Sequence, residues 1–158
     1  MFKNGEYVIY HNTEYIYRYC FENKQKNMVR LVSYDRQSLN DGFYTNKTEE
    51  YMQEHGFRCF KDVPKSEITE AYNIRTYAVY KGVNASIVGW EKDNKVELYT
   101  NCLYGEDEEE FLKQMEYAGF EFSHGEQGGY RVYAKIVSLD DPDLQLLEHR
   151  TELDIDKL

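Results

Sequence analysis

The sequence has few cysteines and no long apolar run. Its three cysteines, Cys20, Cys59 and Cys102, lie far apart and form no Cys-x-x-Cys pair. A disulfide framework or zinc knuckle is therefore not expected, and we predict reduced, mostly buried thiols. No stretch approaches the roughly eighteen consecutive apolar residues of a membrane span, and the N-terminus lacks the apolar core of a signal peptide. These absences predict a cytoplasmic protein without a membrane partner.

Signatures of catalysis and of metal or cofactor binding are also missing. The four histidines, at positions 11, 55, 124 and 149, have no spacing that places two on one face of a helix or strand. No HExxH, GxxxxGK[ST], GxGxxG or GxSxG motif occurs. The glycines of HGEQGGY lie between two strand-like runs and predict a hairpin turn rather than a phosphate cradle. We therefore expect no metal, no cofactor and no enzymatic activity.

Aromatic and acidic side chains are abundant instead. Of 158 residues, 41% are hydrophobic, 16% aromatic and 30% charged, which predicts a single folded domain over residues 1–158. The formal net charge is −10, yet residues 1–100 hold 14 basic and 14 acidic side chains, so the imbalance belongs to residues 101–158, with 5 against 15. Such a field repels nucleic acids and anionic membranes and attracts cationic partners. The alternative is that the acidity only maintains solubility.

The two halves of the sequence align with each other. Three pairs of segments match in the same order: YVIYHN with YAVYKG, MVRLVSYD with KVELYTNC, and MQEHGF with MEYAGF. Ordered matches of this kind predict an internal repeat, with units at residues 5–70 and 75–138. The alternative is chance similarity among aromatic strands.

Each repeat is predicted to begin with three strands and to continue with a helix. Runs rich in Tyr, Val and Ile flank polar turns that contain Asn or Gly. The expected strands cover residues 7–10, 15–21, 28–34, 76–80, 85–90 and 96–100. The first helix is capped by Asn46 or Thr48 and ends at Gly56, and the second runs from about Glu106 to Ala118 and ends at Gly119.

The remainder of each repeat is predicted to return to strand. Residues 120–136 alternate around the glycine-rich turn as a hairpin, and FRCFKDVPKSEI is a shorter version in which Pro64 belongs at a strand end or edge. Asp141-Pro142 predicts a helix start, so residues 139–158 are expected to form a short helix and a loosely held tail. The predicted fold class is α+β, with two pseudo-repeated units of antiparallel β-meander plus one helix, forming one compact domain.

A ladder of aromatic residues recurs at every second position near the N-terminus, at Tyr15, Tyr17, Tyr19 and Phe21. Strands place alternate side chains on one face, so these rings share a surface. The aligned residues of the second repeat are small or apolar, which favours the wall of a core. The alternative is a nucleic-acid stacking platform, which needs basic neighbours along a groove.

The acidic run EDEEE opens the second helix and is bracketed by aromatic residues. One or two carboxylates suffice to favour a first helical turn, and five consecutive ones repel one another. Carboxylates interleaved with rings are typical of a surface that covers a basic partner. The predicted partner-binding residues are Tyr104, Glu106, Asp107, Glu108, Glu109, Glu110, Glu116 and Tyr117; a solvated helix start is the alternative.

Two resemblances follow from these features. The opening MFKNGEYVIYHNTEYIYRY resembles the start of small SH3-like barrels, with a glycine turn before a Tyr-Val-x-Tyr strand. The size, acidity, aromatic content and short strands of the chain resemble the immunity proteins that bacteria produce beside polymorphic toxins. This resemblance implies a cytosolic inhibitor that occludes a basic toxin, such as a nuclease. The alternatives are a phage-type inhibitor that mimics nucleic acid, a small-molecule enzyme and a regulatory adaptor.

Overall fold

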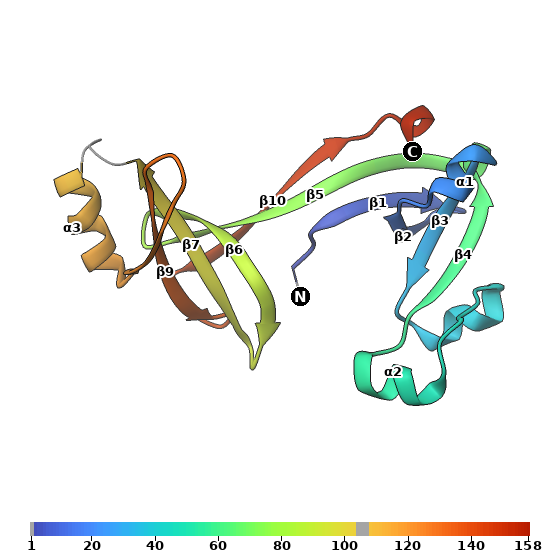
Figure 1. Cartoon of the computed structure of the whole chain (residues 1–158), viewed down its shortest axis with the longest axis horizontal. Helices are drawn as coiled ribbons and strands as arrows, with labels where there is room; N and C mark the ends of the chain where they lie inside the picture. Colours follow the sequence, from blue (N-terminus) through green and yellow to red (C-terminus); the bar gives the residue numbers. More distant parts are fainter. Residues whose placement is uncertain (1, 104–107) are drawn as a thin grey trace. The chain divides into compact units, whose positions relative to one another are not determined.

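The computed structural model describes residues 2–103 and 108–158, and the side chains of these residues except 89–92 and 103. Within these ranges ten strands pair antiparallel and the helices are few, which confirms the predicted α+β class (Figure 1). The strands are β1 (Gly5–Tyr10), β2 (Thr13–Arg18), β3 (Met28–Ser33), β4 (Cys59–Pro64), β5 (Ile68–Tyr80), β6 (Val83–Lys92), β7 (Lys95–Leu103), β8 (Glu121–Glu126), β9 (Tyr130–Ser138) and β10 (Leu144–Glu152). The α-helices are α1 (Phe21–Gln25), α2 (Glu49–His55) and α3 (Glu108–Ala118), and the 3-10 helices are η1 (Arg36–Asp41), η2 (Lys65–Glu67) and η3 (Ile155–Lys157).

The chain divides into two compact units. The first unit comprises Asn4–Ile74 and Arg150–Leu158, and the second comprises Met1–Lys3 and Arg75–His149. The strand order is β4-β3-β2-β1-β5 in the first unit and β5-β6-β7-β9-β8 in the second. Both β5 and β10 cross the division, so each contributes residues to both units. In chain order the first unit runs β1-β2-α1-β3-η1-α2-β4 and the second runs β5-β6-β7-α3-β8-β9, so α1 interrupts the strands of the first unit only.

Two-residue turns connect the antiparallel strands where the sequence predicts polar turns. His11-Asn12 joins β1 to β2, Lys81-Gly82 joins β5 to β6, and Asp93-Asn94 joins β6 to β7. Both residues of each turn have positive φ, between 46° and 80°. This is the type I′ geometry, whose twist matches that of paired strands and which favours Asn, Asp and Gly. The turns His11-Asn12 and Lys81-Gly82 occupy aligned positions in the two halves of the sequence.

Both helices end at the predicted glycines, but only α3 ends in the predicted left-handed motif, since Gly56 after α2 has φ 86° and ψ 153°. At the end of α3, Gly119 has φ +76°, its N–H donates to Glu116 O at 3.2 Å, and the Phe120 N–H donates to Met115 O at 2.9 Å. These bonds form a Schellman motif, in which the residue after the glycine packs back on the last turn. Phe120 and Met115 are both buried in the same core. Thr48, rather than Asn46, caps α2, because its hydroxyl accepts a hydrogen bond from the Tyr51 N–H at 3.3 Å.

Each unit has its own hydrophobic core. The core of the first unit contains Val8, Val29, Leu31, Phe43, Cys59, Val63, Ile68, Ala71 and Leu158. The core of the second contains Ala78, Tyr80, Val83, Ala85, Val96, Leu98, Met115, Ala118, Phe120, Tyr133 and Val137. Of the three cysteines, Cys59 is fully buried, whereas Cys20 and Cys102 are half-buried.

The aromatic ladder is divided by the end of β2. Tyr15 and Tyr17 pack against the core of the first unit, as predicted. Tyr19 and Phe21 lie beyond Arg18 and are 56% and 63% exposed, so their assignment to the same strand was wrong. The reason is local, because Phe21 begins the short helix α1 and the alternation of a strand stops where a helix begins.

The helix predicted after Asp141-Pro142 is not formed. Asp141 instead organises a turn, in which its carboxylate accepts the Asp143 N–H at 2.9 Å and its carbonyl accepts the Leu144 N–H at 3.1 Å. From Leu144 onward the chain is strand β10, which pairs with β5. Backbone pairing with a neighbouring strand therefore overrides the local helix signal.

The residues that follow β10 are also better held than predicted. Leu153 donates its N–H to Ala71 O at 2.8 Å, and Leu158 is 6% exposed within the core of the first unit. The Lys65 ammonium donates to Leu158 O at 2.8 Å. The segment after β10 is thus part of the first unit and not a loose tail.

Candidate functional site

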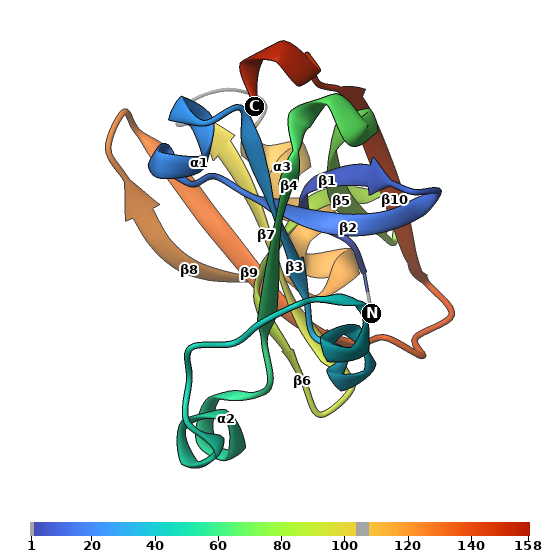
Figure 2. The same ribbon diagram turned by 90° about the vertical axis from the view of Figure 1, so that its right-hand side faces the viewer.

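The outer face of α3 is the candidate site for which the sequence predicts a partner. The inner face of the helix buries Met115 and Ala118 against β6 and β7 residues of the same core. Because side chains three and four residues apart share a helix face, Glu109, Leu112 and Glu116 lie along one exposed side of the helix. The helix lies beside strand β7 of the same unit in both views (Figure 1 and Figure 2).

The structure places five of the eight predicted partner-binding residues. Tyr104, Glu106 and Asp107 lie outside the described residues. Tyr117 is 74% exposed, and Glu109, Glu110 and Glu116 are exposed as well. Glu108 is different, since it is half-buried and bonds Arg131 of β9. The four exposed residues form what we call the acidic face of α3, and Glu108 helps to hold the helix on the sheet.

Few basic groups offset the acidic face of α3. Lys113 lies 3.3 Å from the Glu109 carboxylate, in an i,i+4 pair whose side chains are 74% and 88% exposed. Such an exposed pair contributes little to stability. Glu110 and Glu116 have no ion pair within the part of the chain that the structure describes. The face therefore presents a net negative charge.

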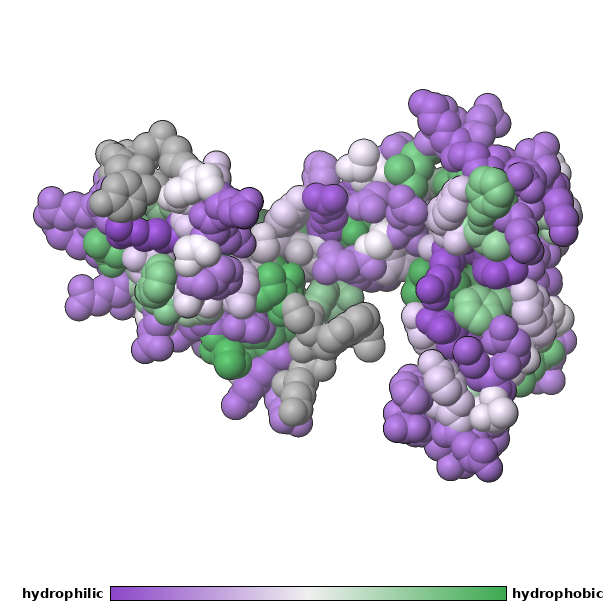
Figure 3. Space-filling view, in the orientation of Figure 1, coloured by the Kyte–Doolittle hydropathy of each residue, from purple (hydrophilic) through white to green (hydrophobic). Residues whose placement is uncertain are grey.

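Exposed apolar side chains lie among the charged residues around the acidic face of α3. Leu112 of α3 is 40% exposed, and Phe122 of the neighbouring strand β8 is 59% exposed with one edge against Tyr133. In the space-filling view, hydrophilic residues cover most of the visible surface around α3, with hydrophobic residues between them (Figure 3). Together with Tyr117, these side chains supply the apolar anchors that binding surfaces place among charges.

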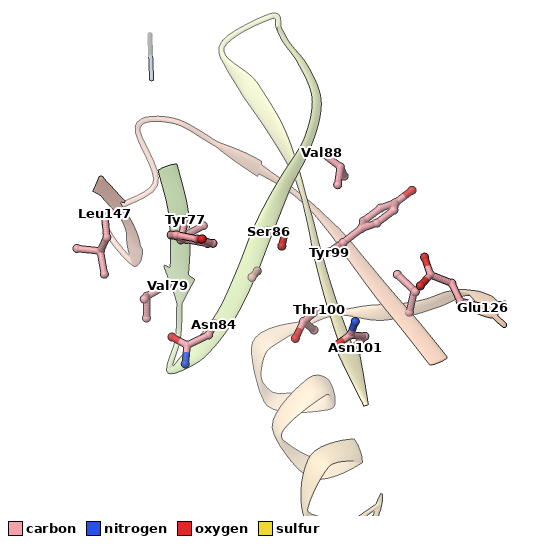
Figure 4. Close-up of a pocket in the computed structure, with 13 residues that line it drawn as sticks. Tyr77, Val79, Asn84, Ser86, Val88, Tyr99, Thr100, Asn101, Glu126 and Leu147 are labelled. Carbon is pink, nitrogen blue, oxygen red and sulfur yellow. The ribbon is translucent and has the colours of Figure 1, made fainter. Parts of the chain in front are cut away.

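A hollow of about 520 Å³ lies on the sheet face that α3 does not cover (Figure 4). Its floor follows from strand register, since Tyr77 pairs with Ser86 and Ser86 pairs with Tyr99. A small side chain thus stands between two large rings, and the space above Ser86 is open. Val79 and Val88 add apolar walls. The hollow has the size of a small-molecule or peptide site.

Polar groups line one end of this hollow. Asn84, Asn101 and Glu126 contribute amide and carboxylate groups. His124 lies edge-on to the Tyr99 ring and within 3.6 Å of the Glu126 carboxylate. Among the described residues, no group of three or more His, Cys, Asp or Glu side chains is arranged to hold a metal ion.

Sequence reasoning missed this hollow for a definite reason. Alternation along β5 separates Tyr77 and Val79 from the buried Ala78 and Tyr80. It does not reveal which residue of β6 stands opposite Tyr77, because register depends on turn geometry and on pairing between strands.

Comparison with known proteins gives a family but no named relative. Residues 2–153 match the model of a family described as "Uncharacterised conserved protein UCP033725". No curated protein and no solved structure matches the chain. Across the described residues, no helix has both the length and the apolar character that a membrane crossing requires.

Proposed function

The chain belongs to the family described as uncharacterised conserved protein UCP033725, and we propose that this member is a protein-binding inhibitor that covers a basic partner with the acidic face of α3. One observation carries the proposal. On this face Tyr117 is 74% exposed beside carboxylates that the described residues leave largely uncompensated. Aromatic side chains supply contact area at interfaces, and the surrounding charges steer a cationic partner toward them.

We propose further that the partner is a basic toxin, such as a nuclease, which the protein neutralises in the cytoplasm by covering it. The concentration of negative charge supports a basic partner, because 15 of the 29 acidic residues fall within residues 101–158. An inhibitor that mimics nucleic acid would use the same carboxylates. Competition between the protein and DNA or RNA for the captured partner distinguishes that alternative.

The proposal is tested by capture with charge-reversed variants. The immobilised protein is exposed to extract of the cells that produce it, at low and at high salt. The variant Glu109→Lys/Glu110→Lys/Glu116→Lys reverses three exposed residues of the acidic face and leaves the Glu108–Arg131 contact intact. The matched control is Glu50→Lys/Glu54→Lys/Glu148→Lys, three exposed residues elsewhere, with Glu50 also in a first helical turn.

We expect the wild type and the control to retain the same basic protein at low salt. The reversed variant should lose it, and so should the wild type at roughly 1 M salt, where the screening length is only about 3 Å. Equal retention by all three proteins at every salt concentration would contradict the proposal.

The hollow of Figure 4 supports a second candidate, binding of a small molecule. The row Tyr77, Ser86 and Tyr99 offers two rings around a gap. Ser86→Leu fills that gap without altering any charge. If Ser86→Leu abolishes retention of the captured partner and the charge-reversed variant still retains it, the binding site is the hollow and not the acidic face of α3.

A further inference from the structure

A second hollow, of about 270 Å³, lies on the outer face of β2, β3 and β4 in the first unit. Register places Arg18 opposite Arg30, and Arg30 opposite Asp62, on one face of these strands. The next row, Tyr17 with Leu31, points to the core on the other face. Arg18, Arg30 and Phe60 line the hollow from these strands, and the other lining residues come from the segments that flank them. None of them belongs to the acidic face of α3.

Four cations line this hollow in a protein whose net charge is −10. They are Arg18, Arg30, Lys47 and Arg58, and no carboxylate stands among the described residues that line it. Asp62 bonds two of the lining residues, Arg30 and Tyr44, but does not itself line the hollow. The convergence of the four cations on one small volume creates a local positive potential.

Only one of the four cations is neutralised. Arg30 donates two hydrogen bonds to Asp62, at 2.8 and 3.0 Å, and Asp62 also accepts from Asn23 and from the Tyr44 hydroxyl. Burial works to raise the pKa of Asp62, but these donors outweigh it and hold that pKa below its usual value. Asp62 is thus saturated by donors and fixes Arg30 in place.

The other three cations have no counter-charge in the described part of the chain. No ion pair involves Arg18, Lys47 or Arg58 within those residues. Arg58 is half-buried and lies over the Phe60 ring, with 5.3 Å between the guanidinium carbon and the ring centroid. Arg30 lies over the same ring at 5.8 Å. Contact with the ring orients both guanidinium groups before any ligand arrives.

We propose that this hollow binds the phosphate group of a small phosphorylated molecule. A guanidinium presents paired N–H donors that match phosphate oxygens, and three uncompensated cations gain a counter-charge when a dianion binds. The volume is below the roughly 300 to 1,000 Å³ of drug-sized sites, which favours a compact ligand over a polymer segment.

Aromatic side chains that line the hollow indicate a ligand with a planar group. Tyr19 lines the hollow and is 56% exposed, and Tyr44, which also lines it, pairs its backbone with Phe60. An exposed ring beside a phosphate site can stack a planar group. A nucleoside monophosphate combines the two features, and it is the first probe.

The test is calorimetric titration of the full chain with four kinds of probe. Nucleoside 5′-monophosphates, inorganic phosphate, nucleosides without phosphate and a single-stranded oligonucleotide are added in separate titrations. The variant Arg58→Gln removes a charge within the hollow. The matched control is Arg36→Gln, because Arg36 also lies over a ring, that of Phe57 at 4.8 Å, but outside the hollow.

We expect the monophosphates to bind more tightly than inorganic phosphate, and the nucleosides not to bind. Arg58→Gln should weaken binding at least about tenfold, since a hydrogen bond to a charged group contributes about 1.5 kcal/mol or more. Arg36→Gln should bind as the wild type does. Absence of binding by all phosphate probes, or equal weakening by both substitutions, would overturn the proposal. So would binding of a single-stranded oligonucleotide without binding of the monophosphates, which would identify a polymer ligand.

Discussion

At the scale of single residues, Asp62 shows how far function and stability depend on contacts that are distant in sequence. Its partners Asn23, Arg30 and Tyr44 lie 39, 32 and 18 residues away. Nothing in the local sequence of Asp62 distinguishes it from the other acidic residues of the chain. The hollow of the first unit therefore could not be predicted from the sequence.

Asp62 should also make stability depend on pH. Its pKa in the folded protein is lowered from an ordinary value of 3.8, so the stabilisation is complete above that pH and is lost as the pH falls through the folded-state pKa. We predict that Asp62→Asn lowers the free energy of unfolding by about 1 to 3 kcal/mol at neutral pH. Below pH 3.8 the difference from wild type should shrink.

Urea unfolding across this pH range measures the effect. The control is Asp93→Asn, since Asp93 is exposed and its turn conformation suits asparagine. A difference between Asp62→Asn and wild type that stays constant into acid would contradict this account of Asp62.

At the scale of elements, the sequence predicted what local rules determine and missed what pairing determines. Polar turns with Asn or Gly and a glycine end for the second helix were both predicted, because these depend on residues at fixed offsets; the type I′ geometry of the turns comes from the structure. The prediction of a helix after Asp141 was wrong, because an Asp-Pro pair begins a turn as readily as it begins a helix. Only the position of β5 decides that the chain continues as β10.

The end of α3 offers a local test, because Gly119 has φ +76°. We predict that Gly119→Ala destabilises the protein by about 1 to 2 kcal/mol through the left-handed conformation it forces on alanine. The added Cβ would also lie 2.9 Å from the Lys135 ammonium, which can move aside. The control is Gly125→Ala in β8, where the nearest atom is 3.8 Å away. Thermal unfolding should show a loss for Gly119→Ala only, and equal melting temperatures would refute the role of this cap.

At the scale of the whole molecule, charge is divided between the two units as the sequence suggested. The second unit contains α3 and most of the acidic excess of residues 101–158, whereas the first unit contains the four cations of its hollow. The acidic excess of residues 101–158 could be predicted from the sequence, because it needs only a count of charged residues along the chain. The gathering of four cations in one hollow could not, because it depends on strand register.

The central claim is that the acidic face of α3 steers a basic partner into contact. The most direct measurement is the association rate constant with the captured partner, followed by surface plasmon resonance over a range of ionic strength. The account predicts that this rate constant falls steeply with salt for the wild type, and that Glu109→Lys/Glu110→Lys/Glu116→Lys lowers it at low salt and flattens its salt dependence. An association rate constant independent of salt, and equal for wild type and variant, would contradict it.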